Sequence, residues 1–131
     1  LPCSQRQVQN DPMQLSVLQA KIHRATVTDA DLDYEGSITI DPNLLESAGL
    51  LCFQQVHVYN ITNGHRFETY IIEGEAGSGD IKINGAAAHL ATTGDKVIIA
   101  AYALVTPDQA RGWTPRLVFV DENNHIKQIK S

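Results

Sequence analysis

The chain has 131 residues, of which 43% are hydrophobic and 19% charged, proportions typical of one globular domain. Its formal net charge of −5 argues against a surface that binds nucleic acid or an anionic membrane. We expect no membrane span and no signal peptide, because no apolar run is long enough for either. The two cysteines are too few for a disulfide framework, so we expect reduced thiols in a cytoplasmic protein.

The first twelve residues differ from the rest of the chain. Residues 1–12 have neither helical nor strand periodicity and end in Asp11-Pro12, a turn-forming pair. We interpret them as a disordered tail or an expression remnant. We expect residues 13–131 to form a single domain, because this length suits one core rather than two.

Residues 13–27 have the alternation of a long strand. Strict alternation places Ala20, Ile22 and Arg24 on one face, and Lys21 and His23 on the other. An acidic stretch follows and leads to Gly36-Ser37, after which residues 38–40 predict a short strand. Asp41-Pro42 is a favourable helix start and Gly49 a helix stop, so a short helix is expected over 43–48.

The remaining chain consists of short strands separated by turns. Asn63-Gly64 predicts a hairpin, and its return strand carries Arg66, Glu68 and Tyr70 on one face and Phe67, Thr69 and Ile71 on the other. The apolar run 97–103 is expected to be a strand buried on both faces. Other strands are expected over 55–60, 81–83 and 117–120, with fraying over 126–131. Many short strands and little helix favour a small β-barrel.

The turn Tyr34-Glu35-Gly36-Ser37 has a second, chemical interpretation. Glycine tolerates conformations that can turn its carbonyl toward the next side chain. If the Ser37 hydroxyl attacks the Gly36 carbonyl, the peptide becomes an ester, and β-elimination then breaks the chain. The new N-terminal dehydroalanine hydrolyses to a pyruvoyl group, an electron sink that can replace PLP. From these four residues alone, a plain turn into a strand remains the alternative.

Motifs for other chemistries are missing from the sequence. The histidines at 23, 57, 65, 89 and 125 are dispersed, without the close spacing typical of a metal site. No nucleophile elbow of the G-x-S-x-G type occurs. The glycines between 74 and 79 lack the Gly-Lys-Ser/Thr ending of a phosphate-binding loop.

Four blocks in order strongly resemble the pyruvoyl-dependent aspartate 1-decarboxylases, which make β-alanine for pantothenate synthesis. These blocks are Lys21-Ile22-His23-Arg24, Asp31 to Asp41, Asn60 to Tyr70 and Ile83 to Ala88, followed by Gly94-Asp95. The similarity covers residues 13–115. It implies a double-psi β-barrel, a homotetramer with active sites between subunits, and self-cleavage at Gly36-Ser37. An N-terminal β-chain and a C-terminal α-chain would result, the latter beginning with pyruvoyl derived from Ser37, without metal or PLP.

The resemblance also implies roles for individual residues. Thr69 assists backbone cleavage and contacts substrate, and Tyr70 donates a proton after decarboxylation. Lys21 and Arg66 hold carboxylates, which suits the two carboxylates of aspartate because Arg binds them with bidentate geometry. Further substrate contacts come from the segment Asn84, Gly85, Ala86 and Ala87. The substrate amine would condense with the pyruvoyl carbonyl as a Schiff base.

Two features depart from this pattern or complicate it. Tyr59 occupies a position where relatives often have tryptophan. Thr69 and Tyr70 lie on opposite faces of one strand, so both reach one site only if the strand bends or a subunit boundary intervenes.

Other functions remain open on the sequence alone. A non-catalytic binding or assembly module on the same barrel, or a pyruvoyl decarboxylase for another amino acid, would share much of this pattern. A nucleic-acid-binding barrel is disfavoured by the acidic charge. Whether a helper protein speeds maturation also stays open.

Overall fold

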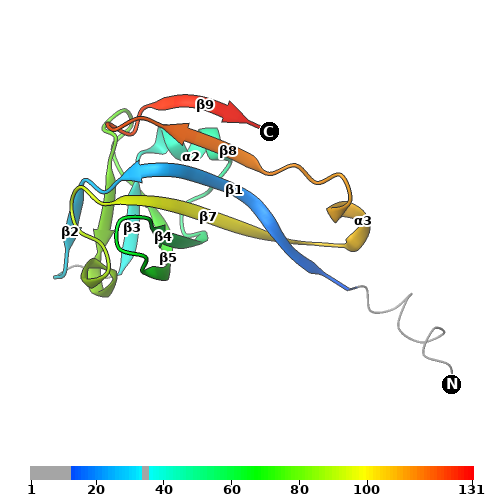
Figure 1. Ribbon diagram of the computed structural model, residues 1–131, viewed down its shortest axis with the longest axis horizontal. Coiled ribbons are helices and arrows are strands. Elements are labelled where there is room, and N and C mark those ends of the chain that lie inside the picture. The colour runs from blue at the N-terminus through cyan, green and yellow to red at the C-terminus, as the bar shows by residue number, and fades with distance from the viewer. Residues whose placement is uncertain (1–12, 34–35) are drawn as a thin grey trace, which may run out of the picture.

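A computed structural model describes residues 13–33 and 36–131 of the chain (Figure 1). The expected tail, residues 1–12, lies outside the described residues, as do Tyr34 and Glu35 of the central turn. Strands dominate the described part, with a few short helices, which confirms the expected mainly-β class. The described helices include none that is both long and apolar enough to cross a membrane.

The described strands form one nine-stranded sheet in the order β2-β6-β3-β5-β4-β7-β1-β8-β9. Parallel and antiparallel pairs are mixed, since β1–β8, β2–β6 and β3–β5 are parallel and the others antiparallel. This composition agrees with the double-psi β-barrel expected from the resemblance. The strands are β1 (Leu15–Thr26), β2 (Asp29–Asp31), β3 (Ser37–Ile40), β4 (Gln55–Asn60), β5 (Arg66–Glu73), β6 (Ile81–Asn84), β7 (Lys96–Val105), β8 (Arg116–Val120) and β9 (Ile126–Lys130).

The described part of the chain has three short helices, each between two strands. They are α2 (Pro42–Ala48), the 3₁₀ helix η1 (Gly85–His89) and α3 (Pro107–Ala110). The sequence signals for α2 are confirmed: the Asp41 side chain accepts a hydrogen bond from the Asn43 amide, and Gly49 ends the helix with φ of 72°. Asp41 is buried, and its carboxylate also accepts from the amides of Gly77 and Gly79. It therefore ties the start of α2 to the loop before β6.

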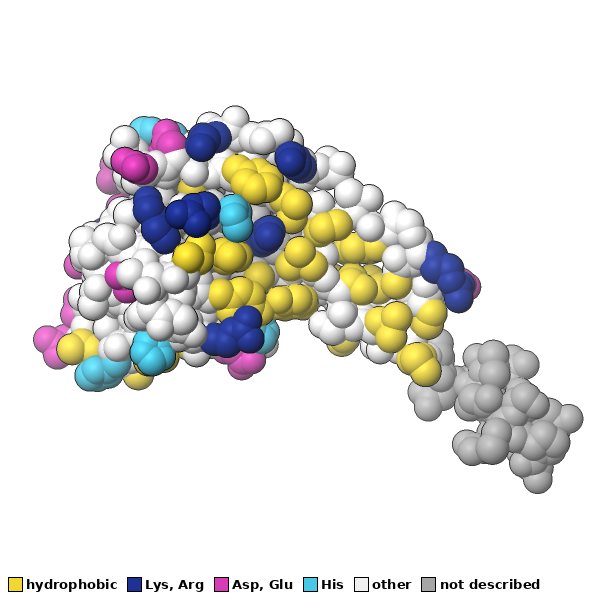
Figure 2. Space-filling model, in the orientation of Figure 1, with side chains coloured by type: hydrophobic (Ala, Val, Ile, Leu, Met, Phe, Trp, Pro, Cys, Tyr) yellow, Lys and Arg dark blue, Asp and Glu magenta, His cyan; other side chains and the backbone are white. Residues whose placement is uncertain are grey.

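The core lies between the inward faces of the strands and α2. It is dominated by β-branched side chains, which pack well on a pleated surface. Beyond it, β1 and β7 continue side by side as a two-stranded arm that leads to α3 (Figure 1). Figure 2 shows hydrophobic side chains along one face of this arm. The exposed apolar residues of the arm and its neighbourhood are Met13, Leu15, Tyr102, Leu104 and Trp113.

The expected alternation of β1 is wrong at one point. The register with β7 shifts between Ile22 and Ala25, and Arg24 has φ of 63°, so a bulge inserts an extra residue. Ala25 therefore continues the buried face of Ala20 and Ile22, and Arg24 is exposed. A bulge of this kind breaks strict period-two alternation and has no clear signal in the sequence.

Two other expectations also need correction. The run 97–103 is not buried on both faces throughout, because Ile98 and Ala103 are half-buried and Tyr102, on the arm, is 39% exposed. Residues 126–130 do not fray in the structure but pair with β8 as an edge strand. The short elements β2 and α3 were not expected from the sequence.

Candidate active site

The last residue of β6, Asn84, lies between the end of β2 and the start of β3. Asp31, the last residue of β2, pairs with Asn84 on one side, and Ser37, the first residue of β3, pairs with it on the other. Ser37 therefore lies beside Asn84, the residue that precedes η1.

Ser37 is almost completely buried, with 1% of its surface exposed, and its φ of 154° is rare for a residue other than glycine. Its hydroxyl oxygen accepts a hydrogen bond from Nδ2 of Asn84 at 2.9 Å. The second Nδ2 proton goes to Thr39 Oγ1 at 3.0 Å. Asn84 therefore fixes the Ser37 oxygen and leaves the hydroxyl proton available to another acceptor. Gly36 is exposed, and a Cβ on it would meet nothing within 4 Å.

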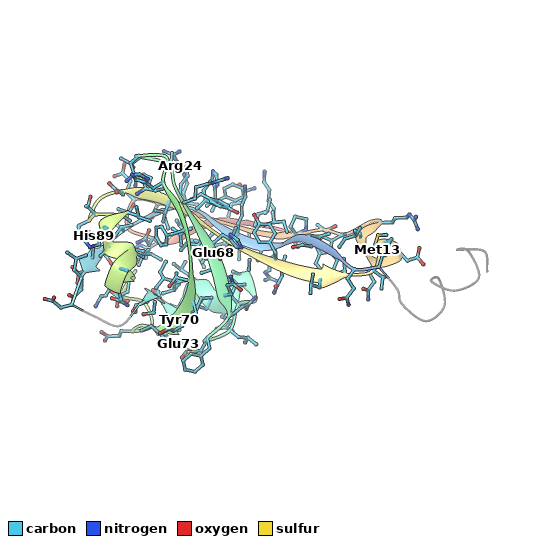
Figure 3. The ribbon with its side chains drawn as sticks, turned by 90° about the horizontal axis from the view of Figure 1, so that it is seen from below. Met13, Arg24, Glu68, Tyr70, Glu73 and His89 are labelled. Atoms are coloured by element: carbon cyan, nitrogen blue, oxygen red, sulfur yellow. The ribbon has the colours of Figure 1, made fainter. Side chains whose placement is uncertain are left out.

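Tyr70 lies level with Ser37 in the sheet. The parallel β3–β5 ladder begins with Ile38 opposite Ile71, so one step back brings Ser37 and Tyr70 together. Ile38 and Ile71 both point into the core, so Ser37 and Tyr70 share the opposite face. Tyr70 is 39% exposed there, and Figure 3 shows it at one end of the body with Glu73.

Thr69 occupies the other face of β5. It pairs with the fully buried Val56 and is itself half-buried. Thr69 precedes the part of β5 that pairs with β3, which begins at Ile71. The expected separation of Thr69 and Tyr70 by face is confirmed.

The segment after Asn84 turns away at once into η1. Gly85 has φ of 75°, a conformation that favours glycine, and it is buried. Ala86 is exposed and Ala87 half-buried, so small side chains follow Asn84 directly. The structure thus brings Asn84 and Gly85 to Ala87 together with Ser37 and Tyr70.

The two expected cations lie elsewhere. Arg66 begins β5, four residues before Tyr70, which corresponds to about 13 Å along a strand. Lys21 lies on β1, and three strands stand between β1 and β3 in the sheet. Lys21 and His57 both pair with Ala100, so they share one face of the sheet with Arg66. Within one chain, neither Lys21 nor Arg66 is next to Ser37 along the sheet.

Arg66 borders an open pocket of about 570 Å³. Its guanidinium carbon lies 4.4 Å from the ring centre of Tyr59, and the Tyr59 hydroxyl is 2.7 Å from that of Tyr102. Burial, followed by this hydrogen bond, raises the pKa of Tyr59. The pocket is lined by His57, Tyr59, Arg66, Phe67 and Glu68.

His23 lies beside Lys21 on β1. Its Nδ1 is buried without a hydrogen-bond partner among the described residues, and its ring meets Phe119 edge-on. Burial, with smaller contributions from Lys21 and Arg24, lowers the pKa of His23. A neutral imidazole suits this position, because a charged ring would face two cations.

Sequence reasoning missed two partners in this region. Thr39 shares the Asn84 amide with Ser37, and alternation from Ser37 places it on the same face, a signal that was present in the sequence. Tyr102 reaches Tyr59 across the β4–β7 pair, a contact that no local pattern indicates. Among the described residues, no three His, Cys, Asp or Glu side chains gather as a metal site would require.

The chain is similar to aspartate decarboxylases over most of its length. The family model described as aspartate decarboxylase matches residues 13–127. Aspartate 1-decarboxylase of Dehalococcoides mccartyi (strain ATCC BAA-2266) is 56% identical over 115 residues, which are 88% of this chain and 93% of that protein. The enzyme of the same name from Syntrophus aciditrophicus is also 56% identical, over 88% of this chain and 99% of its own length. Aspartate 1-decarboxylase from Carboxydothermus hydrogenoformans is 57% identical over 90% of this chain and 93% of its own length.

Proposed function

The chain belongs to the aspartate decarboxylase family, and on that premise we propose that it acts through a pyruvoyl group made from its own Ser37. The reaction removes one carboxylate of L-aspartate as CO₂ and leaves β-alanine, which is used for pantothenate synthesis. The observation that carries the proposal is the buried Ser37 hydroxyl, held by Asn84 at the end of an exposed loop.

Self-cleavage requires a hydroxyl beside a distorted peptide bond. Ser37 Oγ attacks the Gly36 carbonyl carbon, the Ser37 nitrogen leaves, and β-elimination of the ester frees the Gly36 carboxylate. Hydrolysis of the dehydroalanine then releases ammonia. The φ of 154° at Ser37 supports this step, because strained conformations gather at reactive backbone sites. We assign to Thr69, one residue before Tyr70, the group that assists at the Gly36 carbonyl.

The residues around Ser37 fit the prosthetic group that would form there. Among the described residues, Asn84 has the only side-chain amide that bonds the Ser37 oxygen, so it lies beside the residue at which the group would form. When present, the pyruvoyl group supplies an electrophilic carbonyl that withdraws the electrons freed by CO₂ loss. We assign to Tyr70 the delivery of a proton to carbon, and its exposed position supports this role. Gly85, Ala86 and Ala87 leave room for substrate close to the backbone.

Carboxylate recognition requires cations that one chain does not place beside Ser37. We propose that Lys21 and Arg66 act on an active site shared between subunits of a homotetramer. Two observations support this: the separation of Arg66 from Tyr70 along β5, and the exposed apolar arm, which a second copy could cover. Figure 3 shows Met13 at the far end of this arm, well away from Tyr70.

The proposed catalytic unit is residues 13–131, a single domain apart from the tail. We propose the cytoplasm as its location, since Cys52 is a free thiol and the other cysteine, Cys3, lies outside the described residues.

The direct test of the reaction is incubation of the purified protein with L-aspartate and with a panel of other amino acids. We expect one β-alanine and one CO₂ per aspartate, without added PLP or metal. A protein that forms no β-alanine, although fully cleaved at Gly36-Ser37, would contradict the proposal. A higher rate on another amino acid would instead correct the substrate.

A further inference from the structure

Arg66 and Tyr59 face each other across the β4–β5 hairpin. They are directly paired in its ladder, and the guanidinium carbon of Arg66 lies 4.4 Å from the ring centre of Tyr59. A guanidinium at this distance over an aromatic face is attracted by the ring, and the attraction is larger where water is partly excluded. The Tyr59 ring is half-buried, so it offers Arg66 a firm surface on which to lie.

The Tyr59 ring is itself held in place from the next strand. Its hydroxyl lies 2.7 Å from the hydroxyl of Tyr102 on β7. His57 packs edge-on against Tyr102, with ring centres 5.1 Å apart and planes at 85°. We call His57, Tyr59 and Tyr102 the aromatic shelf. It spans two adjacent strands of the sheet, and two of its members, His57 and Tyr59, line the open pocket that Arg66 also lines.

The charge of Arg66 is available to a ligand. In the described part of the chain Arg66 forms no ion pair, whereas the neighbouring Glu68 is occupied by His57, whose Nδ1 lies 3.5 Å from the carboxylate. An anion that enters the pocket would therefore meet one unpaired guanidinium. The Glu68 carboxylate would repel this anion, so the anion would approach from the Arg66 side.

From this geometry we propose that the Tyr59–Tyr102 hydrogen-bonded pair positions the Arg66 guanidinium for a substrate carboxylate and so sets the affinity for the dicarboxylate. The inference rests on the proposed function, because it assumes that Arg66 holds one carboxylate of aspartate. Arginine loses much rotational freedom when it binds, and a side chain already held on a ring loses less of it on binding. Neither tyrosine needs to touch the substrate, so both are positioning residues.

The test is a double-mutant cycle on the two hydroxyls. Tyr59→Phe and Tyr102→Phe each delete one end of the same hydrogen bond and keep both rings. Each should raise the KM for aspartate about 3- to 10-fold, the range that corresponds to one neutral hydrogen bond. kcat, cleavage at Gly36-Ser37 and thermal stability should change little. The double variant should be no worse than either single variant, because the bond is already lost.

Further variants separate this inference from the proposed function. Tyr59→Leu removes the whole ring and should raise KM further, toward the value for Arg66→Ala. Tyr59→Trp returns an aromatic face without the phenol, so its KM should be close to that of Tyr59→Phe. A KM near that of the unaltered protein for Arg66→Ala would overturn the role of Arg66 itself. Two outcomes would overturn only the positioning role. In the first, KM rises in Arg66→Ala but not in Tyr59→Phe or Tyr102→Phe. In the second, the KM effects of the two tyrosine variants are additive in the double variant.

A second readout does not depend on activity. Burial and the Tyr102 hydroxyl raise the pKa of Tyr59, so one tyrosine should ionise late in an ultraviolet titration. Tyr59→Phe should remove that late component, and Tyr102→Phe should shift it to lower pH. If Tyr102→Phe leaves the pH of the Tyr59 component unchanged, the hydrogen bond is not formed in solution and the inference is overturned.

Discussion

Nδ2 of Asn84 donates one hydrogen bond to the Ser37 hydroxyl, at 2.9 Å, across the pair that begins the β3–β6 ladder. The two residues are 47 positions apart in sequence, and both are buried. The donor fixes the oxygen that must attack and leaves its proton free to depart. The reactive geometry therefore depends on β6 as much as on the turn that contains the bond.

Replacing Asn84 should slow maturation. In Asn84→Ala the Ser37 oxygen loses its fixed orientation, and cleavage should slow by about 10- to 100-fold, as expected when a nucleophile is misplaced by a fraction of an ångström or more. The measurement is a time course of chain cleavage in freshly purified protein. Asn43→Ala, on the exposed side of α2, is the matched control and should cleave normally. Equal rates for the two variants would remove Asn84 from the mechanism.

Replacing Arg66 should weaken substrate recognition. Arg66→Ala should lower kcat/KM for aspartate roughly 30- to 1000-fold, which corresponds to a loss of about 2–4 kcal/mol in transition-state stabilisation. The reason is that a carboxylate loses its charged partner in a partly desolvated pocket. Arg111→Ala is a suitable control, since the Arg111 side chain is 76% exposed and, among the described residues, forms an ion pair only with Asp108 of α3. The measurement is steady-state kinetics on both variants, with the same fraction of chains cleaved at Gly36-Ser37 in each preparation. Unchanged kcat/KM for Arg66→Ala would contradict the assignment.

Replacing Tyr70 should separate maturation from turnover. Tyr70→Phe keeps the ring but removes the hydroxyl, so folding and cleavage should survive. Turnover needs a proton at carbon, and its rate should fall by roughly 10²–10⁴-fold, as expected for loss of a general acid. Single-turnover formation of β-alanine by the fully cleaved variant measures this directly. If the rate is unchanged, Tyr70 is only an exposed strand residue and the proton has another source.

The hydrogen bonds of Asp95 should make the free energy of unfolding depend on pH in the acid range. Its carboxylate accepts hydrogen bonds from the Thr92 amide at 3.0 Å and from Asn60 Nδ2 at 2.9 Å, and these bonds lower its pKa. The stabilisation is therefore present above the unfolded pKa of 3.8 and is lost as the pH falls through the lower folded value. Asp95→Asn should cost about 1 kcal/mol at pH 7, and the difference should shrink in acid. Melting curves from pH 7 to pH 2 test this; a constant difference would contradict it.

Local patterns predicted the elements that carry the site. The helix signals at Asp41 and Gly49, the strand over 55–60 and the alternation after Arg66 are all confirmed, because each depends on neighbours in sequence. The Gly36-Ser37 turn drew attention for its chemistry, and the structure adds that Ser37 is buried beside Asn84. The sequence alone could not supply this pairing, since it arises from the order of strands in the sheet.

The failures also have physical causes. The bulge at Arg24 depends on how β1 twists between β7 and β8, which alternation does not encode. Tyr102 and Leu104 look like core residues by composition, yet they lie on an arm that extends beyond the body (Figure 1). The distance of Lys21 and Arg66 from Ser37 within one chain likewise follows from the order of strands in the sheet, which the sequence does not give.

The central claim is that Ser37 cuts its own chain, and the most direct test is the intact mass of the purified protein under native and denaturing conditions. Denaturation should release fragments of 36 and 95 residues, which together make the 131 of the chain. Under native conditions they should stay together, because β1 of the shorter fragment lies between β7 and β8 of the longer one. Ser37→Ala should remain a single chain. A single uncut chain in the unaltered protein, or the same cut in Ser37→Ala, would contradict the account.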